Sequence, residues 1–405
     1  MMQSTSIARA VKLLVALVAV GGYIGGASAA EGTTRVIVKF KEGRVTTTSM
    51  KSAVTFAKGT VKHEIFGTTA MAIEVPVSAL QGLKNNPNVE YVEEDLIRYP
   101  VALTTPSTGT PYFTGQAVPY GIKLVQADLL PDTNAGNRKV CIIDSGVDRA
   151  HEDLVGNSAN MSGQYDSGTG NWYQDQNSHG THVAGTIAAV NNSGLGVVGV
   201  NSNKRLKLHF VKVFGAGGWA YSSTLASAAN QCASAGANVI SMSLGGSGSN
   251  TTESNAFANL ASRGILSVAA AGNAGNSSIS YPAGYASVMM VGAVNEYKQW
   301  ASFSQYNSKV EITGPGVSVY STVPLAVKGT KYAYFNGTSM ATPHVAAVAA
   351  LVWSYFPSCT GAQIRTTLGR SALDLGTAGR DTKYGYGLVQ AKAAYDRIRT
   401  YGCGA

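Results

Sequence analysis

Charge is scarce in this sequence. Asp, Glu, Lys and Arg make up 13% of its 405 residues, against about 25% in a typical soluble domain. A chain so low in charge and 45% hydrophobic is neither intrinsically disordered nor a coiled coil, because both classes need abundant charged residues. Basic residues outnumber acidic ones by 31 to 22, but they form no run of like charges and no stripe with interleaved aromatics. We therefore expect a globular protein that does not bind nucleic acid.

Apolar runs long enough to span a membrane are also missing. The apolar stretch Leu13–Val20 follows Arg9 and Lys12 and is interrupted by a glycine-rich segment, whereas a membrane-spanning helix needs about 20 apolar residues. A basic start, a short apolar centre and the small residues at 27–30 are typical of a cleaved export signal. We predict that residues 1–30 are a signal peptide, and that the protein is secreted and has no membrane contact after cleavage.

Cysteines are few, namely Cys141, Cys232, Cys359 and Cys403, and none has the spacing of a zinc site. An even number in an oxidising compartment favours disulfides, and four cysteines allow three pairings. Cys359 and Cys403 flank the C-terminal segment, so a bond between them would hold a tail that otherwise frays. Cys141 would then pair with Cys232. Buried free thiols are the alternative.

Two globular segments follow the signal. Residues 31–100 combine strand-like runs with one helix-like stretch and predict a small α+β unit, whose last strand is expected at Asn88–Ile97. Residues 99–116 carry no charge and are rich in Thr, Pro and Gly, which is typical of a linker. From about residue 115 onward, apolar strands alternate with helices, a pattern that favours a parallel sheet with helices on both faces. Functional residues gather at the carboxyl ends of the strands in such sheets.

Three polar clusters lie at the ends of apolar elements of this second segment. They are Ile142-Ile143-Asp144-Ser145-Gly146, Asn177-Ser178-His179-Gly180-Thr181-His182 and Asn336-Gly337-Thr338-Ser339-Met340-Ala341. Together they supply a carboxylate, an imidazole and a hydroxyl, the parts of an activated nucleophile. Taken singly, Asp144 could be a turn residue, and His179 or Ser339 a helix cap. Three such clusters in one chain argue against coincidence.

The clusters resemble the Asp, His and Ser motifs of the subtilisin-like serine proteases, and they follow the same order along the chain. An esterase of the α/β-hydrolase class would have its serine first and a Gly-x-Ser-x-Gly turn, where Ala341 replaces the last Gly here. An inactive subtilisin fold that serves as a binding protein would normally lack a triad residue, and none is lost. The resemblance covers about 115–405 and implies a subtilisin-like α/β fold with serine endopeptidase activity on proteins and peptides.

The resemblance extends into the first segment, because Tyr91-Val92-Glu93-Glu94-Asp95 is similar to the end of a subtilisin propeptide. It implies that residues 31–104 are a propeptide that assists folding and inhibits the enzyme until it is cut off. Residues 105–405 would be the peptidase domain, which we expect to be a monomer. The cut is expected between Pro100 and Gln116.

Catalytic roles follow from the same resemblance. Asp144 would orient the base, His179 would be the base, Ser339 would attack the peptide carbonyl, and Asn273 would bind the oxyanion. His182 is a rival base, because positions three apart share one face of a helix; the family motif places the base at the first of the pair. A metal site at this pair would lack the glutamate of a His-Glu-x-x-His motif.

Substrate-binding positions are also implied by the resemblance. They are Gly217, Gly218, Ser243, Leu244, Gly245 and Ser280. Glycine at such positions lets an extended peptide approach and pair as an added strand. Ser280 would lie at the base of the pocket for the residue before the cleaved bond, the P1 residue. Because no acidic residue lies near it in the sequence, we expect a preference for apolar or aromatic P1 residues.

Calcium is the cofactor that the resemblance implies. Gln116, Asp153 and Asn192 are similar to parts of the strong calcium site of the family. The loop that contains Asn192 is one residue longer than usual. Carboxylate, amide and main-chain oxygens are the ligands that this hard cation prefers. We therefore expect a structural Ca²⁺ site.

Overall fold

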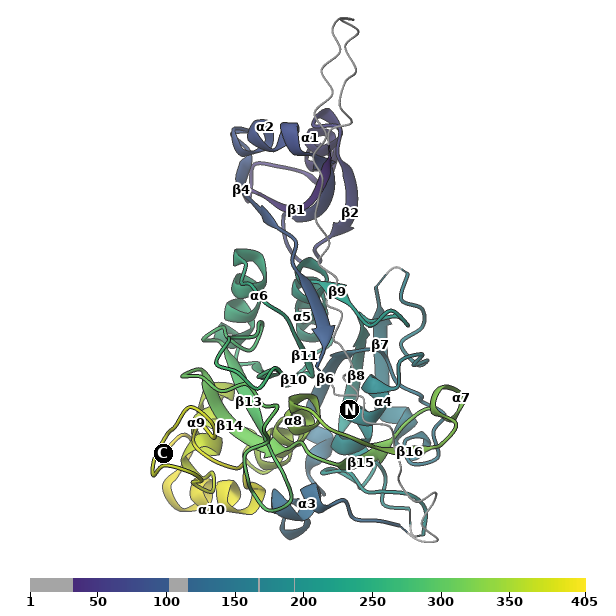
Figure 1. The fold of residues 1–405 in the computed structure, drawn as a ribbon, viewed down its shortest axis with the longest axis vertical. Coiled ribbons are helices and arrows are strands. Elements are labelled where there is room, and N and C mark those ends of the chain that lie inside the picture. The colour runs from purple at the N-terminus through teal and green to yellow at the C-terminus, as the bar shows by residue number, and fades with distance from the viewer. Residues whose placement is uncertain (1–31, 102–115, 167, 193) are drawn as a thin grey trace, which may run out of the picture.

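The computed structural model describes residues 32–101, 116–166, 168–192 and 194–405. The predicted signal peptide and most of the predicted linker lie outside these residues. Within them, no helix is both long enough and apolar enough to cross a membrane. The chain forms a small N-terminal unit that stands on a larger one (Figure 1).

The N-terminal unit is an antiparallel sheet with two helices on one face (Figure 1). The sequence predicts an α+β unit here, but with one helix instead of two. Its strand order is β2-β3-β1-β4. The elements are β1 (Thr33–Phe40), α1 (Thr47–Phe56), β2 (Thr60–Glu64), β3 (Ala70–Pro76), η1 (Val77–Ala79), α2 (Leu80–Lys84) and β4 (Val89–Glu94). Met50 and Val54 of α1 pack with Val36 and Val38 of β1 in one buried cluster. Alternate residues of β1 therefore face the helices, as the two-residue period of a strand requires.

The larger unit contains a seven-stranded sheet in the order β14-β13-β12-β10-β6-β8-β7, in which every neighbouring pair is parallel. The strands are β6 (Lys139–Asp144), β7 (Met161–Tyr165), β8 (Lys207–Lys212), β10 (Val239–Met242), β12 (Leu266–Ala270), β13 (Val288–Val294) and β14 (Val310–Pro315). Outside this sheet lie β5 (Ile97–Pro100), β9 (Ala220–Tyr221), β11 (Leu244–Gly245), β15 (Val319–Thr322) and β16 (Tyr332–Phe335). The α-helices are α3 (Tyr120–Leu124), α4 (His179–Ala188), α5 (Ser222–Ser234), α6 (Thr251–Ser262), α7 (Leu325–Lys328), α8 (Thr338–Tyr355), α9 (Gly361–Arg370) and α10 (Ala391–Tyr401), and the short 3₁₀ turns are η2 (Ala127–Leu129), η3 (Ala135–Asn137) and η4 (Val155–Asn160).

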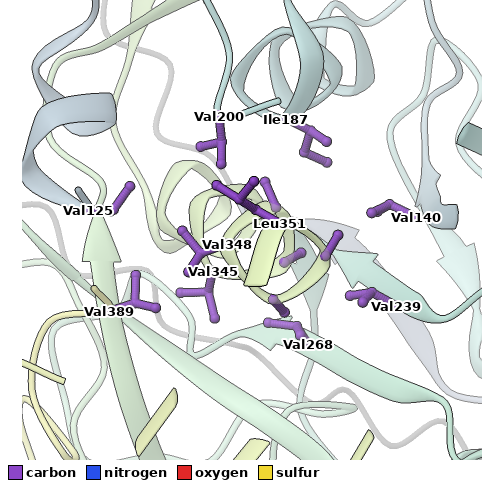
Figure 2. Packing of buried hydrophobic residues seen from close by; sticks show 14 of the residues in the cluster. Val125, Val140, Ile187, Val200, Val239, Val268, Val345, Val348, Leu351 and Val389 are labelled. Carbon is purple, nitrogen blue, oxygen red and sulfur yellow. The ribbon is translucent and has the colours of Figure 1, made fainter. Parts of the chain in front are cut away.

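Helices cover both faces of this sheet, as predicted. Val140 and Ile142 of β6 belong to the cluster that contains α4 and α8, while Cys141 and Ile143 belong to the cluster that contains α5 and α6. Helix α8 runs through the centre of the first cluster (Figure 2), and all its residues except Tyr355 are buried. A helix that is apolar on all sides is stable only inside a core, so α8 holds its N-terminal residues in a rigid position.

Both disulfides have the predicted pairing. Cys141 of β6 is bonded to Cys232 of α5, and Cys359 is bonded to Cys403 near the C-terminus. The first bond ties a central strand to a helix that covers it. The second closes the tail against the segment that precedes α9.

The two units share a buried interface. Ile37, Ile65 and Ala70 of the N-terminal unit pack against Ala226 of α5 and Ala256 of α6. Ile37 alternates with Val36 and Val38 along β1, so the sheet of the small unit uses its second face for this contact.

Acidic side chains of the N-terminal unit cap two helices of the larger unit. Glu93 accepts hydrogen bonds from the backbone N–H groups of Thr251 and Thr252, both at 2.7 Å, at the start of α6. Asp95 accepts from the N–H of Ser223 at 3.0 Å at the start of α5. The first N–H groups of a helix lack intrahelical partners and attract negative charge. The small unit therefore stabilises two helices that cover the sheet.

Two expectations about this region are wrong. The single strand predicted at Asn88–Ile97 is broken after Glu94, because Asp95 turns to cap α5. Tyr99 and Pro100, predicted as the start of a linker, form the end of β5. This strand leaves the small unit and pairs antiparallel with β11 on one side and β9 on the other. The composition of the segment resembles a linker, but the strands of the larger unit supply its hydrogen-bond partners.

Candidate active site

Asp144 and His179 meet at the carboxyl end of the central strand β6. Asp144 is the last residue of β6, and His179 is the first residue of α4. The Nδ1 atom of His179 lies 2.8 and 2.9 Å from the two carboxylate oxygens of Asp144. Because a carboxylate only accepts, Nδ1 carries the proton and Nε2 of the neutral ring is left as the acceptor. That Nε2 atom is buried and has no hydrogen-bond partner in the described part of the chain.

A second buried carboxylate, Asp175, joins the loop after β6 to the start of α4. It accepts hydrogen bonds from the N–H groups of Ser178 and Thr181 and from the hydroxyl of Ser145. The close approach of the two segments also requires glycine at position 180, since a Cβ atom there would lie 2.1 Å from the carbonyl oxygen of Gly146. Asp175 and Gly180 therefore set the distance between Asp144 and His179.

His182 takes no part in this pair. Its Nε2 atom lies 3.0 and 3.1 Å from the carbonyl oxygens of Val319 and Ala333, and its ring stacks on Phe335. Complete burial lowers the pKa of His182 to about 3, so the ring is neutral. The structure thus separates the two histidines that spacing alone leaves equivalent.

Ser339 is the second residue of α8 and is fully buried. Its hydroxyl donates to the carbonyl oxygen of Ser243 at 2.8 Å. The side chain of Ser243 donates in return to the carbonyl oxygen of Ser339, also at 2.8 Å. In the part of the chain that the structure describes, this hydroxyl is not hydrogen-bonded to His179, whose Nε2 atom has no partner.

Asn273 lies after β12, close to the start of α8. Its Oδ1 atom accepts from both the N–H and the hydroxyl of Thr338 at 2.9 Å. This contact leaves the Nδ2 atom of Asn273 facing the opposite way, where it donates to the carbonyl oxygen of Val101 at 2.9 Å. The amide is thus held in advance by the residue that precedes Ser339.

The chain's own segment Ile97–Val101 lies across this site as an extended peptide. Tyr99 and Pro100 of β5 pair with Gly245 and Leu244 of β11, respectively. The N–H of Val101 donates to the carbonyl oxygen of Ser243 at 3.2 Å. Val101 is therefore held at its N–H by Ser243 and at its carbonyl by Asn273, beside the hydroxyl of Ser339.

The other predicted substrate positions surround this peptide. Ser280 is buried next to Gly245. A Cβ atom on residue 245 would lie 2.2 Å from the hydroxyl oxygen of Ser280. Gly217 and Gly218 lie in a turn before β9. The strand that pairs with this side of the peptide is β9, two residues further along. The turn still contributes, since a Cβ atom on Gly218 would lie 4.0 Å from the ring of Pro100.

The three predicted calcium ligands lie together. The amide nitrogen of Gln116 is 2.8 Å from the carbonyl oxygen of Val190, 3.2 Å from that of Val197 and 3.3 Å from Oδ1 of Asn192. Asp153 contacts the same loop through Asn192 and the N–H of Val197. No cluster of three His, Cys, Asp or Glu side chains occurs in the described ranges. The oxygen atoms of Val190, Val197 and Asn192 thus surround the amide nitrogen of Gln116, and amide and main-chain oxygens are ligands that a hard cation accepts.

The model of the subtilase family matches residues 136–387, more than half of the chain. The chain belongs to the subtilase family. Among curated relatives, subtilisin E of Bacillus subtilis is 39% identical over 368 residues, which cover 89% of this chain and 90% of the relative. An alkaline protease of Alkalihalobacillus alcalophilus is 41% identical over 337 residues, 82% of this chain and 80% of the relative.

Solved structures agree with this assignment. The psychrophilic subtilisin-like protease Apa1 of Pseudoalteromonas sp. AS-11 superimposes with a TM-score of 0.67 at 37% identity and covers 72% of this chain and all of its own. Fervidolysin of Fervidobacterium pennivorans, a keratinolytic enzyme related to subtilisin, gives a TM-score of 0.74 at 28% identity over 90% of this chain and 61% of its own. The subtilisin-like fold is confirmed, and this subtilase is a serine-type endopeptidase.

Several residues at the site escaped the sequence analysis. Glu93 and Asp95 lie inside the motif that resembles a propeptide end, but nothing in that motif shows which helices they cap. Arg98 and Glu253 form a buried ion pair beside the cleft, although they are 155 residues apart. The only signal in the sequence is that Glu253 stands in a stretch of small, neutral residues. No local pattern indicates that Arg98 is its partner.

Proposed function

We propose that this subtilase is a secreted endopeptidase made as a precursor that cuts itself between Val101 and Ala102. The observation that carries the proposal is the hydrogen bond of 2.9 Å between the Val101 carbonyl oxygen and Asn273. Residues 1–30 would direct export. The unit that ends at Val101 would then be the propeptide, which occupies the cleft as an intramolecular inhibitor, so the boundary expected after residue 104 moves to 101.

In the proposed mechanism, Ser339 is the nucleophile. Its hydroxyl rotates from the Ser243 carbonyl to Nε2 of His179, which accepts the proton as the Oγ–C bond forms. Asp144 holds the ring in the tautomer that leaves Nε2 free and stabilises the imidazolium. The support for these roles is the contact of Nδ1 of His179 with both oxygens of Asp144.

Asn273 and the N–H of Ser339 would bind the oxygen that becomes negative as Ser339 attacks. Donors fixed in advance stabilise that charge without reorganisation, and Thr338 fixes the amide of Asn273. The C–N bond then breaks, and His179 gives its proton to the leaving amine. Water, deprotonated by His179, releases the acyl group and restores the serine.

Labelling with a fluorophosphonate tests the proposed activity directly. We expect the purified mature protein to cleave a peptide of the sequence Ile-Arg-Tyr-Pro-Val-Ala-Leu after Val, and the reagent to modify Ser339 alone and abolish cleavage. The denatured protein, which has no assembled site, should not be labelled. Cleavage of esters without peptides would favour an esterase, and failure to label Ser339 would favour an inactive scaffold.

We further propose that the enzyme prefers apolar or aromatic P1 residues. Val101 itself is apolar, and the predicted pocket base, Ser280, is neutral and buried. Peptides that differ only at P1 should show kcat/KM at least ~10-fold higher for Leu or Phe than for Arg, because an unpaired charge is costly to bury. The variant Ser280→Asp should narrow that ratio. Faster cleavage after Arg by the unaltered enzyme would contradict the preference.

Calcium binding is proposed for Gln116, Asp153 and Asn192 together with main-chain oxygens. The ion would bind these segments to one another and so stabilise the folded state. At a Ca²⁺ concentration 100 times its Kd, the gain is ~2.7 kcal/mol, or roughly 4 °C in Tm for a domain of about 300 residues. We expect EDTA to lower the Tm by that amount, and Asp153→Asn to remove most of the Ca²⁺-dependent shift. Equal Tm values with Ca²⁺ and with EDTA would contradict the site.

A further inference from the structure

Arg98 is the fourth residue before the proposed cut and is the most deeply buried residue of β5. It is 0% exposed, whereas its neighbours Ile97 and Tyr99 are 41% and 51% exposed. The strand therefore inserts one charged side chain into the larger unit and leaves the flanking side chains outside. Burial by itself lowers the pKa of Arg98, but the carboxylate of Glu253 outweighs this effect and raises it.

Every guanidinium N–H of Arg98 has an acceptor. Nε and Nη2 contact the two carboxylate oxygens of Glu253 at 3.1 and 2.7 Å. The other donors reach the carbonyl oxygens of Ser247, Gly248 and Ile97, each at 3.1 Å. An arginine has five such donors in a fixed fork. The pocket therefore matches arginine in both charge and shape.

The pocket belongs to the peptidase side of the molecule. Glu253 is fully buried in the first turn of α6, and its N–H donates to the side chain of Asn250. The hydroxyl of Tyr285 donates to the carboxylate at 2.7 Å. Glycine at position 246 lets the backbone of β5 approach closely, because a Cβ atom there would lie 2.6 Å from the carbonyl oxygen of Ile97. Apart from Ile97, all of these residues, and Ser247 and Gly248, belong to the larger unit.

Release of the N-terminal unit would remove the cation from this carboxylate. In the described ranges, Arg98 is the only residue that forms an ion pair with Glu253. Glu253 would keep its hydrogen bond from Tyr285 but lose its positive partner, and a carboxylate in a pocket without a cation is disfavoured. A peptide that enters the same groove pairs with β9 and β11 as β5 does, and its fourth residue before the cut meets Glu253.

We propose that Glu253 selects arginine at the fourth position before the cleaved bond (P4) in protein substrates, as it does in the chain's own propeptide. This inference rests on the proposed function, because it assumes that β5 lies in the substrate groove. It adds to the P1 preference, since Val101 and Arg98 are different positions of the peptide, three residues apart. The enzyme would then cut after an apolar residue when an arginine stands three positions before that residue.

Peptides of the form X-Tyr-Pro-Val-Ala-Leu, with X as Arg, citrulline, Lys or Leu, test the proposal on the mature enzyme. Citrulline has nearly the shape of arginine but no charge. Loss of one partner of a buried, hydrogen-bonded charge pair should lower kcat/KM at least ~30-fold. We therefore expect kcat/KM for the Arg peptide to exceed that for the citrulline and Leu peptides by at least this factor. Lys should fall between them, because it has three donors instead of five.

Variants assign the selectivity to one carboxylate. Glu253→Gln should reduce the ratio of kcat/KM for the Arg peptide to that for the citrulline peptide to within ~3-fold. Glu296→Gln, which removes an exposed carboxylate elsewhere, should keep the full ratio. Equal rates for Arg and Leu peptides with the unaltered enzyme would overturn the proposal, as would a ratio that survives in Glu253→Gln. If the unaltered enzyme cleaves none of the peptides, the proposed function itself fails.

Discussion

Replacing Ser339 by Ala should leave the chain uncut and without peptidase activity. The precursor holds Val101 between Ser243 and Asn273, so only the attacking hydroxyl is removed and the peptide should stay bound. Loss of the nucleophile of a serine protease lowers kcat by ~10⁶. Mass and N-terminal sequence should show the unaltered chain trimmed to a form that begins at Ala102, and the variant should retain the N-terminal unit.

A folded variant is needed to interpret this result. The buried interface and the caps of α5 and α6 do not involve Ser339, so Ser339→Ala should have the circular dichroism of a folded protein and resist added protease. His179→Ala gives a second, independent precursor with the serine intact. If both variants are trimmed like the unaltered chain, another protease matures this one. If even the unaltered chain stays whole, the N-terminal unit is no propeptide.

Replacing Asp144 by Asn should lower kcat by ~10⁴ with little change in KM. Asn presents an N–H group where Asp144 presents an acceptor, so the proton of His179 moves from Nδ1 to Nε2 and the base is lost. Substrate binding should be preserved, because in the part of the chain that the structure describes the carboxylate of Asp144 is hydrogen-bonded to Ser145 and His179 and not to the β5 segment. Initial rates of peptide hydrolysis over a range of substrate concentrations separate kcat from KM.

Asp148→Asn is the matched control for this variant. Asp148 lies in the same loop and accepts a hydrogen bond from the N–H of Ala150, but it does not contact His179. Its replacement should change kcat by no more than a few-fold. A comparable loss in both variants would mean that the loop, not the contact with the imidazole, controls the rate. A loss below ~10-fold in Asp144→Asn would contradict the proposed role of this carboxylate.

Much of the larger unit is encoded in local pattern. Apolar runs at Lys139–Ile143 and Met289–Ala293 predict strands, and the long apolar stretch at Ser339–Tyr355 predicts a helix; the structure has β6, β13 and α8 there. The polar clusters at the ends of these elements predict the site, because the carboxyl ends of parallel strands meet at one edge of a sheet. Each of these inferences depends on residues that are neighbours in the sequence.

The sequence by itself determined the class of fold, the candidate triad and the number of disulfides that the cysteines allow. Only the tertiary structure decided that His179, and not His182, contacts Asp144. Only it placed Tyr99 and Pro100 in the cleft, and Arg98 against Glu253. The physical reason is the same in each case. Hydrophobic period and residue chemistry are local properties, whereas the partner of a buried polar group is set by segments that the chain brings together from far apart.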